Sequence, residues 1–281
     1  GFNKQYDAPL CPEEFTVLAT DGSHIDVDRH HSVRCSLINV GSIALHYGPS
    51  PDAELNSEAV VYFGDDLVLT GKSKNRTKLI EGTLLGVKRS IKEFSALADV
   101  ALKQPSGQPV LAMVDGSLVL WGLSPEDYEG FVREEMLDKE YLKSFDIMKQ
   151  RSGDGEFALC AYTSFPRNAD VVNALRIYLC GCDPIDCDRC PADQRGCEDV
   201  DGITDGILFE ALLDVGRRSA TFKSGWKYVQ DYYGEHQVSF FYLKVGDELA
   251  RVEIPQWVAE RSDMVGIVHS LVLDQCRRGM G

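Results

Sequence analysis

The sequence predicts a mixed α/β fold in which helices flank a largely antiparallel sheet. Three observations predict it: apolar runs of strand length fill the first quarter of the chain, a long segment with helical periodicity follows, and both kinds of run then recur to the end. A chain of 281 residues, with 44% hydrophobic and 26% charged residues, can bury a sizeable core. We expect one domain over residues 1–281, with a cysteine-rich insertion at 180–201.

The first quarter of the chain is expected to form an antiparallel meander. Its apolar runs have the length and residue types of strands, and glycines and prolines between them are typical of turns. The first run stops at Asp21-Gly22-Ser23. The predicted strands are 15–20, 33–40, 42–47 and 59–63, with a turn at Gly41.

A long helix is expected over 74–103, because apolar residues recur there at steps of three and four along one stripe. The almost unbroken apolar run 109–114 is typical of a strand covered on both faces, and it too ends in Asp-Gly-Ser. The other predicted elements are helices at 127–150, 169–179, 203–215 and 263–276, strands at 118–121 and 157–163, and a hairpin of 238–244 with 248–254.

The two Asp-Gly-Ser triplets, which begin at Asp21 and Asp115, are the most informative feature. Each is predicted to follow a buried strand, so each carboxylate would project from a rigid element into a cleft beyond the sheet edge. If the two strands are neighbours, the carboxylates converge, as in enzymes that hydrolyse phosphodiesters with two divalent cations. The alternative is a plain hairpin turn, for which Asp-Gly between apolar runs is the strongest short signal. The pattern leaves both interpretations open.

The formal net charge of −15 argues against a protein that binds a nucleic-acid backbone by itself, because binding phosphates requires clustered Lys and Arg. A DNA-binding function would need cations that neutralise some of the acids, or a basic partner. No apolar run reaches the roughly 18 to 20 residues of a membrane span and no secretory leader is recognisable, so a cytoplasmic location is the simplest expectation. The sequence contains no Gly-x4-Gly-Lys-Ser/Thr loop, so we do not expect the chain to power a motor.

Five of the nine cysteines crowd into one short stretch, which favours a metal site over disulfides. Four thiolates can enclose Zn²⁺ tetrahedrally, and such a closed shell would be structural. An iron–sulfur cluster, reduced thiols and a disulfide are the alternatives. The five are Cys180, Cys182, Cys187, Cys190 and Cys197, whereas Cys11, Cys35, Cys160 and Cys276 are interpreted as ordinary thiols.

Several other residues are weaker candidates for a functional role. His30 or His31 could reach a metal at the first triplet or be ordinary strand-edge histidines, and Asp205 could bind metal or cap the helix that follows it. His269 is expected to pack or to be solvated. The candidates for phosphate contact are Arg167, Arg217 and Arg218, because guanidinium matches phosphate geometry, with plain surface solvation as the alternative for each.

Seven segments form a set that is more specific than either triplet alone. They are Thr20-Asp21-Gly22-Ser23, Asp28-Arg29-His30, 37–41, 88–93, Val114-Asp115-Gly116-Ser117-Leu118, 170–176 and 251–258. In this order, and covering nearly the whole chain, they resemble the NurA family of DNA nucleases.

The resemblance implies an RNase H-like core whose metal-binding acids are Asp21, Glu93 and Asp115. By residue pattern alone Glu93 is an unremarkable helical acid one turn after Arg89. The resemblance also implies Mn²⁺-stimulated cleavage of DNA ends during double-strand break repair, a homodimer, and docking onto a HerA-type hexameric ATPase that translocates DNA. Two Mn²⁺ or Mg²⁺ ions would then be bridged by Asp21 or Asp115, while Glu93 would hold one ion and orient the attacking water.

One departure from the family pattern bears on activity. The pattern continues beyond the final helix with a Gly-Tyr-Pro element and an Ala-His pair whose Tyr and His complete the active site, whereas this sequence ends at Gly279-Met280-Gly281. Either the sequence is an incomplete portion of the enzyme or this member is impaired. The alternative to a nuclease is a catalytically weak scaffold or regulatory subunit of the same translocase complex, which the retention of all three acids opposes. A zinc-stabilised binding module unrelated to nucleases ranks last.

Overall fold

The computed structural model describes residues 3–26, 34–72, 76–124, 127–153, 155–182, 185–187, 189–191 and 195–279. Within these residues, ten strands form one large sheet and two more form a small sheet. The strands of the large sheet are β1 (Gln5–Tyr6), β2 (Phe15–Asp26), β3 (Cys35–Tyr47), β4 (Asp52–Phe63), β7 (Val110–Asp115), β8 (Phe157–Ser164), β9 (Arg218–Ser219), β10 (Phe222–Lys223), β11 (Val238–Val245) and β12 (Glu248–Pro255). The small sheet consists of β5 (Val68–Thr70) and β6 (Thr77–Leu79). The order along the large sheet is β1–β9–β11–β12–β8–β7–β2–β3–β4, and β10 pairs with β11.

Five neighbouring strands form the part of the sheet that carries the acidic triplets. β2, β3 and β4 pair antiparallel in chain order, β2 pairs parallel with β7, and β7 pairs parallel with β8. Beyond β8, β12 and β11 continue the sheet in antiparallel fashion. This is an RNase H-like order extended by a hairpin. The expected mixed, largely antiparallel sheet is therefore confirmed.

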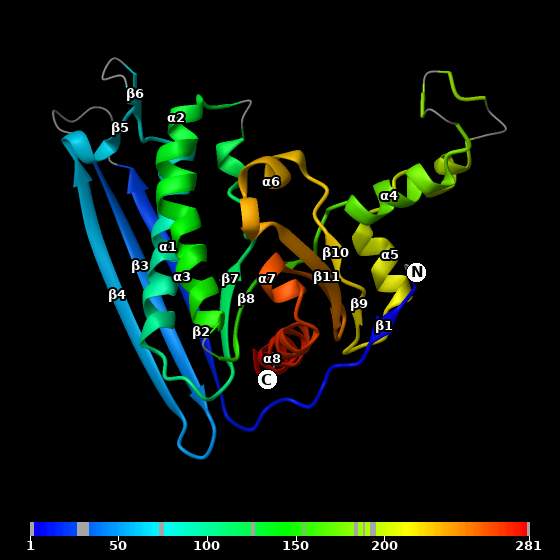
Figure 1. Cartoon of the computed structure of the whole chain (residues 1–281), viewed down its shortest axis with the longest axis horizontal. Coiled ribbons are helices and arrows are strands. Elements are labelled where there is room, and N and C mark those ends of the chain that lie inside the picture. Colours follow the sequence, from blue (N-terminus) through cyan, green and yellow to red (C-terminus); the bar gives the residue numbers. More distant parts are fainter. Residues whose placement is uncertain are drawn as a thin grey trace.

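Helices cover both faces of the sheet (Figure 1). Because side chains alternate along a strand, Leu18 packs under α1 (Thr83–Lys103) and α3 (Leu142–Gly153), whereas its neighbour Val17 packs against α8 (Ser262–Gly279) on the opposite face. Burial on both faces explains why the central strands contain nearly unbroken apolar runs.

The remaining helices are short. Two of them, α4 (Asp170–Leu179) and α5 (Asp205–Leu212), form a third apolar cluster with β11 and β12 at the far side of the sheet. No helix in the described part of the chain is long and apolar enough to cross a membrane. The others are α2 (Gly130–Arg133), the π-helix η3 (Glu134–Tyr141), α6 (Lys227–Tyr232), α7 (Gln256–Ala259), and the 3-10 turns η1 (Gly64–Leu67), η2 (Trp121–Leu123), η5 (Gly196–Val200) and η6 (Gly234–His236).

Two turns that the sequence predicts in the first quarter are wrong. β2 runs through the first Asp-Gly-Ser triplet to Asp26, and β3 is one continuous strand through Gly41. The two strands pair along their whole length, with Asp21 opposite Gly41. Hydrogen bonding to β3 therefore keeps the backbone extended where local sequence favours a turn, and the first triplet does not lie at a strand end.

Other predicted boundaries also shift. The helix predicted from residue 74 begins only at Thr83, because 77–79 pairs with β5 as β6. Residues 118–121 form no strand: Gly116 has a φ of 96°, and the chain continues into η2 instead of returning along β7. The hairpin-turn interpretation therefore fails for both triplets. The helix predicted at 127–150 is divided into α2, η3 and α3, that at 203–215 is α5 alone, and the β11–β12 hairpin is confirmed.

Candidate active site

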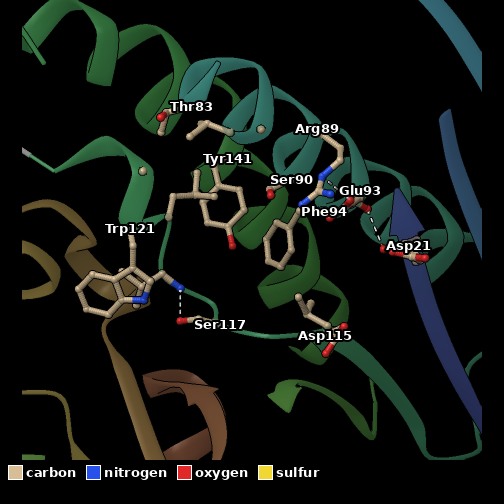
Figure 2. A pocket seen from close by; sticks show the side chains of 17 residues that line it. Asp21, Thr83, Arg89, Ser90, Glu93, Phe94, Asp115, Ser117, Trp121 and Tyr141 are labelled. Atoms are coloured by element: carbon tan, nitrogen blue, oxygen red, sulfur yellow. Dashed lines mark hydrogen bonds and ion pairs between the residues drawn. The ribbon is translucent and has the colours of Figure 1, made fainter. Parts of the chain in front are cut away.

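Asp21, Glu93 and Asp115 line one cavity of about 580 Å³. They come from three elements of the core: the middle of β2, the middle of α1 and the last residue of β7. Figure 2 shows the three acids at one end of this cavity and Trp121 at the other. Asp21 and Asp115 are exposed and Glu93 is partly buried. The three acids do not form a group whose ligand oxygens all lie within 4.8 Å of one another, so the arrangement as it stands does not bring all three onto a single ion.

The sheet register explains how the two aspartates reach the same cavity. β2 and β7 pair in parallel only over four residues, ending at Ala19 opposite Met113. Each aspartate follows two residues later, where the two strands no longer pair with one another. Next to Asp21, the Thr20 hydroxyl donates to the Glu93 carbonyl oxygen at 3.0 Å. This bond ties β2 to α1 beside the acids.

Gly22 allows the Glu93 carboxylate to approach β2 closely. A Cβ atom at this position would lie 2.4 Å from Oε1 of Glu93, so no other residue fits without displacing the carboxylate. Arg89 holds the same arrangement from α1: its Nε lies 3.1 Å from Oε1 of Glu93, and its Nη1 donates to the Gly22 carbonyl oxygen at 3.3 Å. The glycine of the first triplet is thus needed for close approach rather than for a turn.

The electrostatic state of Glu93 reflects its crowded surroundings. Burial raises the pKa of Glu93 most, and the nearby charges of Asp21 and Asp115 raise it further. Arg89 and the Gly22 amide lower it, but the net shift is upward. The ionised form of the Glu93 carboxylate is therefore disfavoured as long as Arg89 is the only positive charge acting on it. Three acids with hard oxygen donors, two of them raising the pKa of the third, are a donor set that suits Mg²⁺ or Mn²⁺.

A buried carboxylate supports the segment that follows Asp115. Glu253 on β12 is 4% exposed, and its Oε2 accepts from the Ser117 hydroxyl at 2.8 Å and from the Leu118 amide at 3.0 Å. Its Oε1 accepts from Nε of Arg251 at 3.0 Å. Glu253 therefore fixes the exit of the chain from β7, where the second triplet turns.

The same polar network extends to α4. Nη1 of Arg251 donates to Asp170 at 2.6 Å and contacts the Tyr242 hydroxyl, which donates to Asp205 at 2.7 Å. Asp205 is fully buried and accepts from the amides of Val171 and Val172 at 3.0 and 2.8 Å. The prediction that Asp205 caps the helix after it is wrong, because Asp205 caps the N-terminus of α4, while Thr204 caps α5.

Exposed aromatic side chains form the other end of the cavity. Trp121 on η2 also borders a second cavity of about 400 Å³ lined by Trp226, Tyr228 and Tyr232. Trp121 and Trp226 are 43% and 47% exposed, and their rings meet edge to face with centroids 5.2 Å apart. Large aromatic faces left open to solvent beside an acidic cavity are available for stacking.

The predicted arginines do not gather at the cavity. Arg217 pairs with Asp7 at 2.8 Å and with Asp214 at 3.0 Å, and Arg218 lies over the Tyr6 ring at 4.4 Å. Both are at β9, four strands from β7, which corresponds to about 19 Å at roughly 4.8 Å per strand. Arg167 is exposed, three residues after β8.

The remaining candidates divide between described and undescribed parts of the chain. His30 and His31 lie outside the described residues. His269 is fully buried, contacts the Gly216 carbonyl oxygen at 3.0 Å, and has its pKa lowered to about 4, first by burial, so it packs in the core. The sulfurs of Cys180, Cys182 and Cys190 gather, and Cys187 and Cys197 lie on the same segment.

Sequence reasoning missed three residues that organise the cavity. Arg89 had a visible signal, its spacing of four residues before Glu93 on one helix face. Trp121 had a weaker one, its position six residues after Asp115. Glu253 had only its place in the 251–258 segment of the family resemblance, because the pairing of β12 with β8 is what brings it beside the second triplet.

Comparisons with known proteins identify the family. A model of the NurA domain matches residues 15–275. Similar solved structures include LC9-RNase H1, a type 1 RNase H with the type 2 active-site motif, at 9% identity and a TM-score of 0.27 over 60% of this chain and 72% of that one. The prototype foamy virus protease–reverse transcriptase has 15% identity and a TM-score of 0.26 over 55% of this chain and 19% of that one. Aquifex aeolicus Argonaute has 12% identity and a TM-score of 0.25 over 93% of this chain and 25% of that one.

No match was found among curated proteins. The family model nevertheless covers nearly all of the sequence, including both Asp-Gly-Ser triplets and the helix that carries Glu93. The chain therefore belongs to the NurA family.

Proposed function

We propose that this protein is a divalent-metal-dependent DNA nuclease that hydrolyses phosphodiester bonds and resects DNA ends. We further propose that it works as a homodimer beside a HerA-type hexameric translocase, in the cytoplasm. The observation that carries the proposal is the convergence of Asp21, Glu93 and Asp115 from three core elements on one cavity of a NurA-family chain. Carboxylates of this kind are what phosphodiester hydrolysis with two cations needs.

Each acid has a role that follows from its position. Asp21 and Asp115 are exposed on the two parallel strands and Glu93 faces the cavity from the helix, so these three carboxylates would hold the divalent ions. Mn²⁺ or Mg²⁺ bound there would supply a Lewis acid for the scissile phosphate and a more acidic water. Before any cation binds, Arg89 and the Gly22 amide stabilise the ionised form of Glu93 and keep its carboxylate aimed at the cavity.

DNA affinity must come from something other than a basic surface, because the chain carries a net charge of −15. Trp121 and Trp226 support stacking with an unpaired base, a contact that needs no positive charge. Cations at the three acids would reduce the local repulsion of phosphate, and a ring-shaped partner would deliver the strand.

Cleavage of end-labelled linear DNA tests the proposal. The full-length protein, with its ring partner, would be assayed with Mn²⁺, Mg²⁺ or EDTA beside Asp115→Asn. The control is Asp99→Asn, which removes one exposed acid of α1 that lies outside the cavity. We expect metal-dependent degradation that Asp115→Asn abolishes and Asp99→Asn retains. Absence of cleavage by the wild type with its partner would favour the catalytically weak scaffold instead.

A further inference from the structure

The cysteine-rich segment has no part in the nuclease proposal. Its described residues run from the end of α4 to η5, and Figure 1 places α4 on the opposite side of the molecule from α1, which carries Glu93. Whatever this segment binds, its chemistry is separate from that of the acidic cavity.

Three sulfurs in this segment lie at the spacing of ligands to a single metal ion. The Sγ atoms of Cys180, Cys182 and Cys190 are all within 4.8 Å of one another, and those of Cys182 and Cys190 are 2.7 Å apart. Two sulfurs on one zinc ion can be at most about 4.6 Å apart, and about 3.8 Å in a tetrahedron, because each Zn–S bond is about 2.3 Å. The cluster therefore fits one ion after the close pair opens by about 1 Å.

The chain folds back to the end of α4 and brings a fourth cysteine, Cys197, near these three, although its sulfur is not one of the group within 4.8 Å. α4 ends at Leu179, and Gly196, the first residue of η5, packs so tightly there that an added Cβ would lie 3.1 Å from the Leu179 carbonyl oxygen. Next to it, Nε of Arg195 donates to the Cys190 carbonyl oxygen at 3.0 Å. Cys197 follows these two contacts directly and is partly buried, whereas Cys187 is exposed.

We propose that Cys180, Cys182, Cys190 and Cys197 bind one Zn²⁺ in a closed tetrahedral site that folds the segment between α4 and η5. The chemical class of the ion follows from the donors, since four soft thiolates select zinc over the hard cations of the acidic cavity. Binding replaces four S–H protons with four Zn–S bonds and changes no oxidation state. A multi-iron cluster is larger than one ion and would spread its cysteines further apart than the observed group.

The site is structural because four protein ligands leave no open position for a substrate. It would stabilise a segment whose described residues contain little apolar core: of its cysteines only Cys190 is buried, and Ile185 is 50% exposed. An ion pair of Arg176 with Asp201, at 3.2 Å, is exposed and adds little by itself.

Zinc analysis of the whole protein tests this inference independently of nuclease activity. Protein purified under reducing conditions would be analysed for metal by mass spectrometry, and zinc affinity would be measured by competition with a chromogenic chelator. We expect one zinc per chain, and a loss of affinity of about tenfold or more in Cys182→Ser, Cys190→Ser and Cys197→Ser. Cys187→Ser and the distant exposed Cys11→Ser are matched controls that retain zinc.

Three results would overturn the proposal. They are wild-type protein without zinc, iron with acid-labile sulfide in its place, and loss of zinc in Cys187→Ser but not in Cys197→Ser. Circular dichroism of each variant separates loss of the ion from loss of the fold. Limited proteolysis gives a second readout, because chelation is expected to expose the 180–201 segment to cleavage while the sheet stays resistant.

Discussion

Substitution of Gly22 by alanine is expected to impair catalysis far more than stability. The new methyl group would lie 2.4 Å from Oε1 of Glu93, and ordinary contact begins at 3.4 Å, so the carboxylate must move by about 1 Å. A displacement of that size at a reacting centre costs on the order of a hundredfold in rate, or about 2.7 kcal/mol of activation free energy. The clash includes Cγ of Glu93 at 2.8 Å and Cδ at 3.0 Å but no backbone atom, so the whole side chain must shift, and the free energy of unfolding should change by less than about 2 kcal/mol.

Single-turnover DNA cleavage at saturating Mn²⁺, together with thermal unfolding, measures both effects. Gly225→Ala is the matched control, because its Cβ meets no atom within 4 Å and its φ is not positive. If Gly22→Ala cleaves within about threefold of the wild-type rate, close approach of Glu93 to β2 is not part of the productive geometry.

Three further predictions concern the acids, their support and the aromatic wall. The pKa of Glu93 is raised in the folded, metal-free protein, so the folded state binds this proton more tightly than the unfolded chain does. The free energy of unfolding should therefore fall as the pH rises from 4.5 through the folded-state pKa. Glu93→Gln should remove this slope in EDTA and raise the melting temperature at neutral pH, which scans at several pH values would reveal; an unchanged slope would contradict it. Glu253→Gln places an amide donor against another donor, either Arg251 or the Leu118 amide. The variant should lose about 1–3 kcal/mol of unfolding free energy in denaturant titrations and cleave DNA more slowly. Wild-type stability of the variant would mean that the network is dispensable. Trp121→Ala should weaken binding of a single-stranded oligonucleotide by about 1–3 kcal/mol in EDTA, measured by fluorescence anisotropy, with blunt duplex binding unaffected; equal losses on both DNAs would argue against stacking.

Local sequence was sufficient for elements whose signal is periodic or fully buried. The β11–β12 hairpin, β7 and the apolar stripe of α1 were all predictable, because period and burial act on each segment alone. The two triplets were ambiguous because Asp-Gly favours a hairpin in isolation. What decides them is non-local: β3 continues to pair through Asp21 opposite Gly41, and Glu253 draws Ser117 away from a returning strand.

The candidate site could be assembled from sequence only through the family resemblance. Residue pattern placed Asp21 and Asp115 beside strands but gave no reason to join them to Glu93, which lies 22 residues before Asp115 on a different element. Parallel pairing of β2 with β7, and the packing of α1 across β2, supply that reason in the folded chain. Glu253 is separated from Asp115 by a much longer stretch of chain, which explains why residue pattern gives no reason to join it to the site.

The parallel pairing of β2 with β7 also has a consequence for the newly made chain. Parallel strands cannot be joined by a tight turn, and here the meander, the small β5–β6 sheet and the whole of α1 must emerge before β7 can reach β2. The β2–β7 contact therefore cannot form until all of these elements have been synthesised. A partly synthesised or truncated chain that lacks β7 therefore has only two of the three acids. Under the proposed function, a chain still lacking β7 would therefore be unable to cleave DNA.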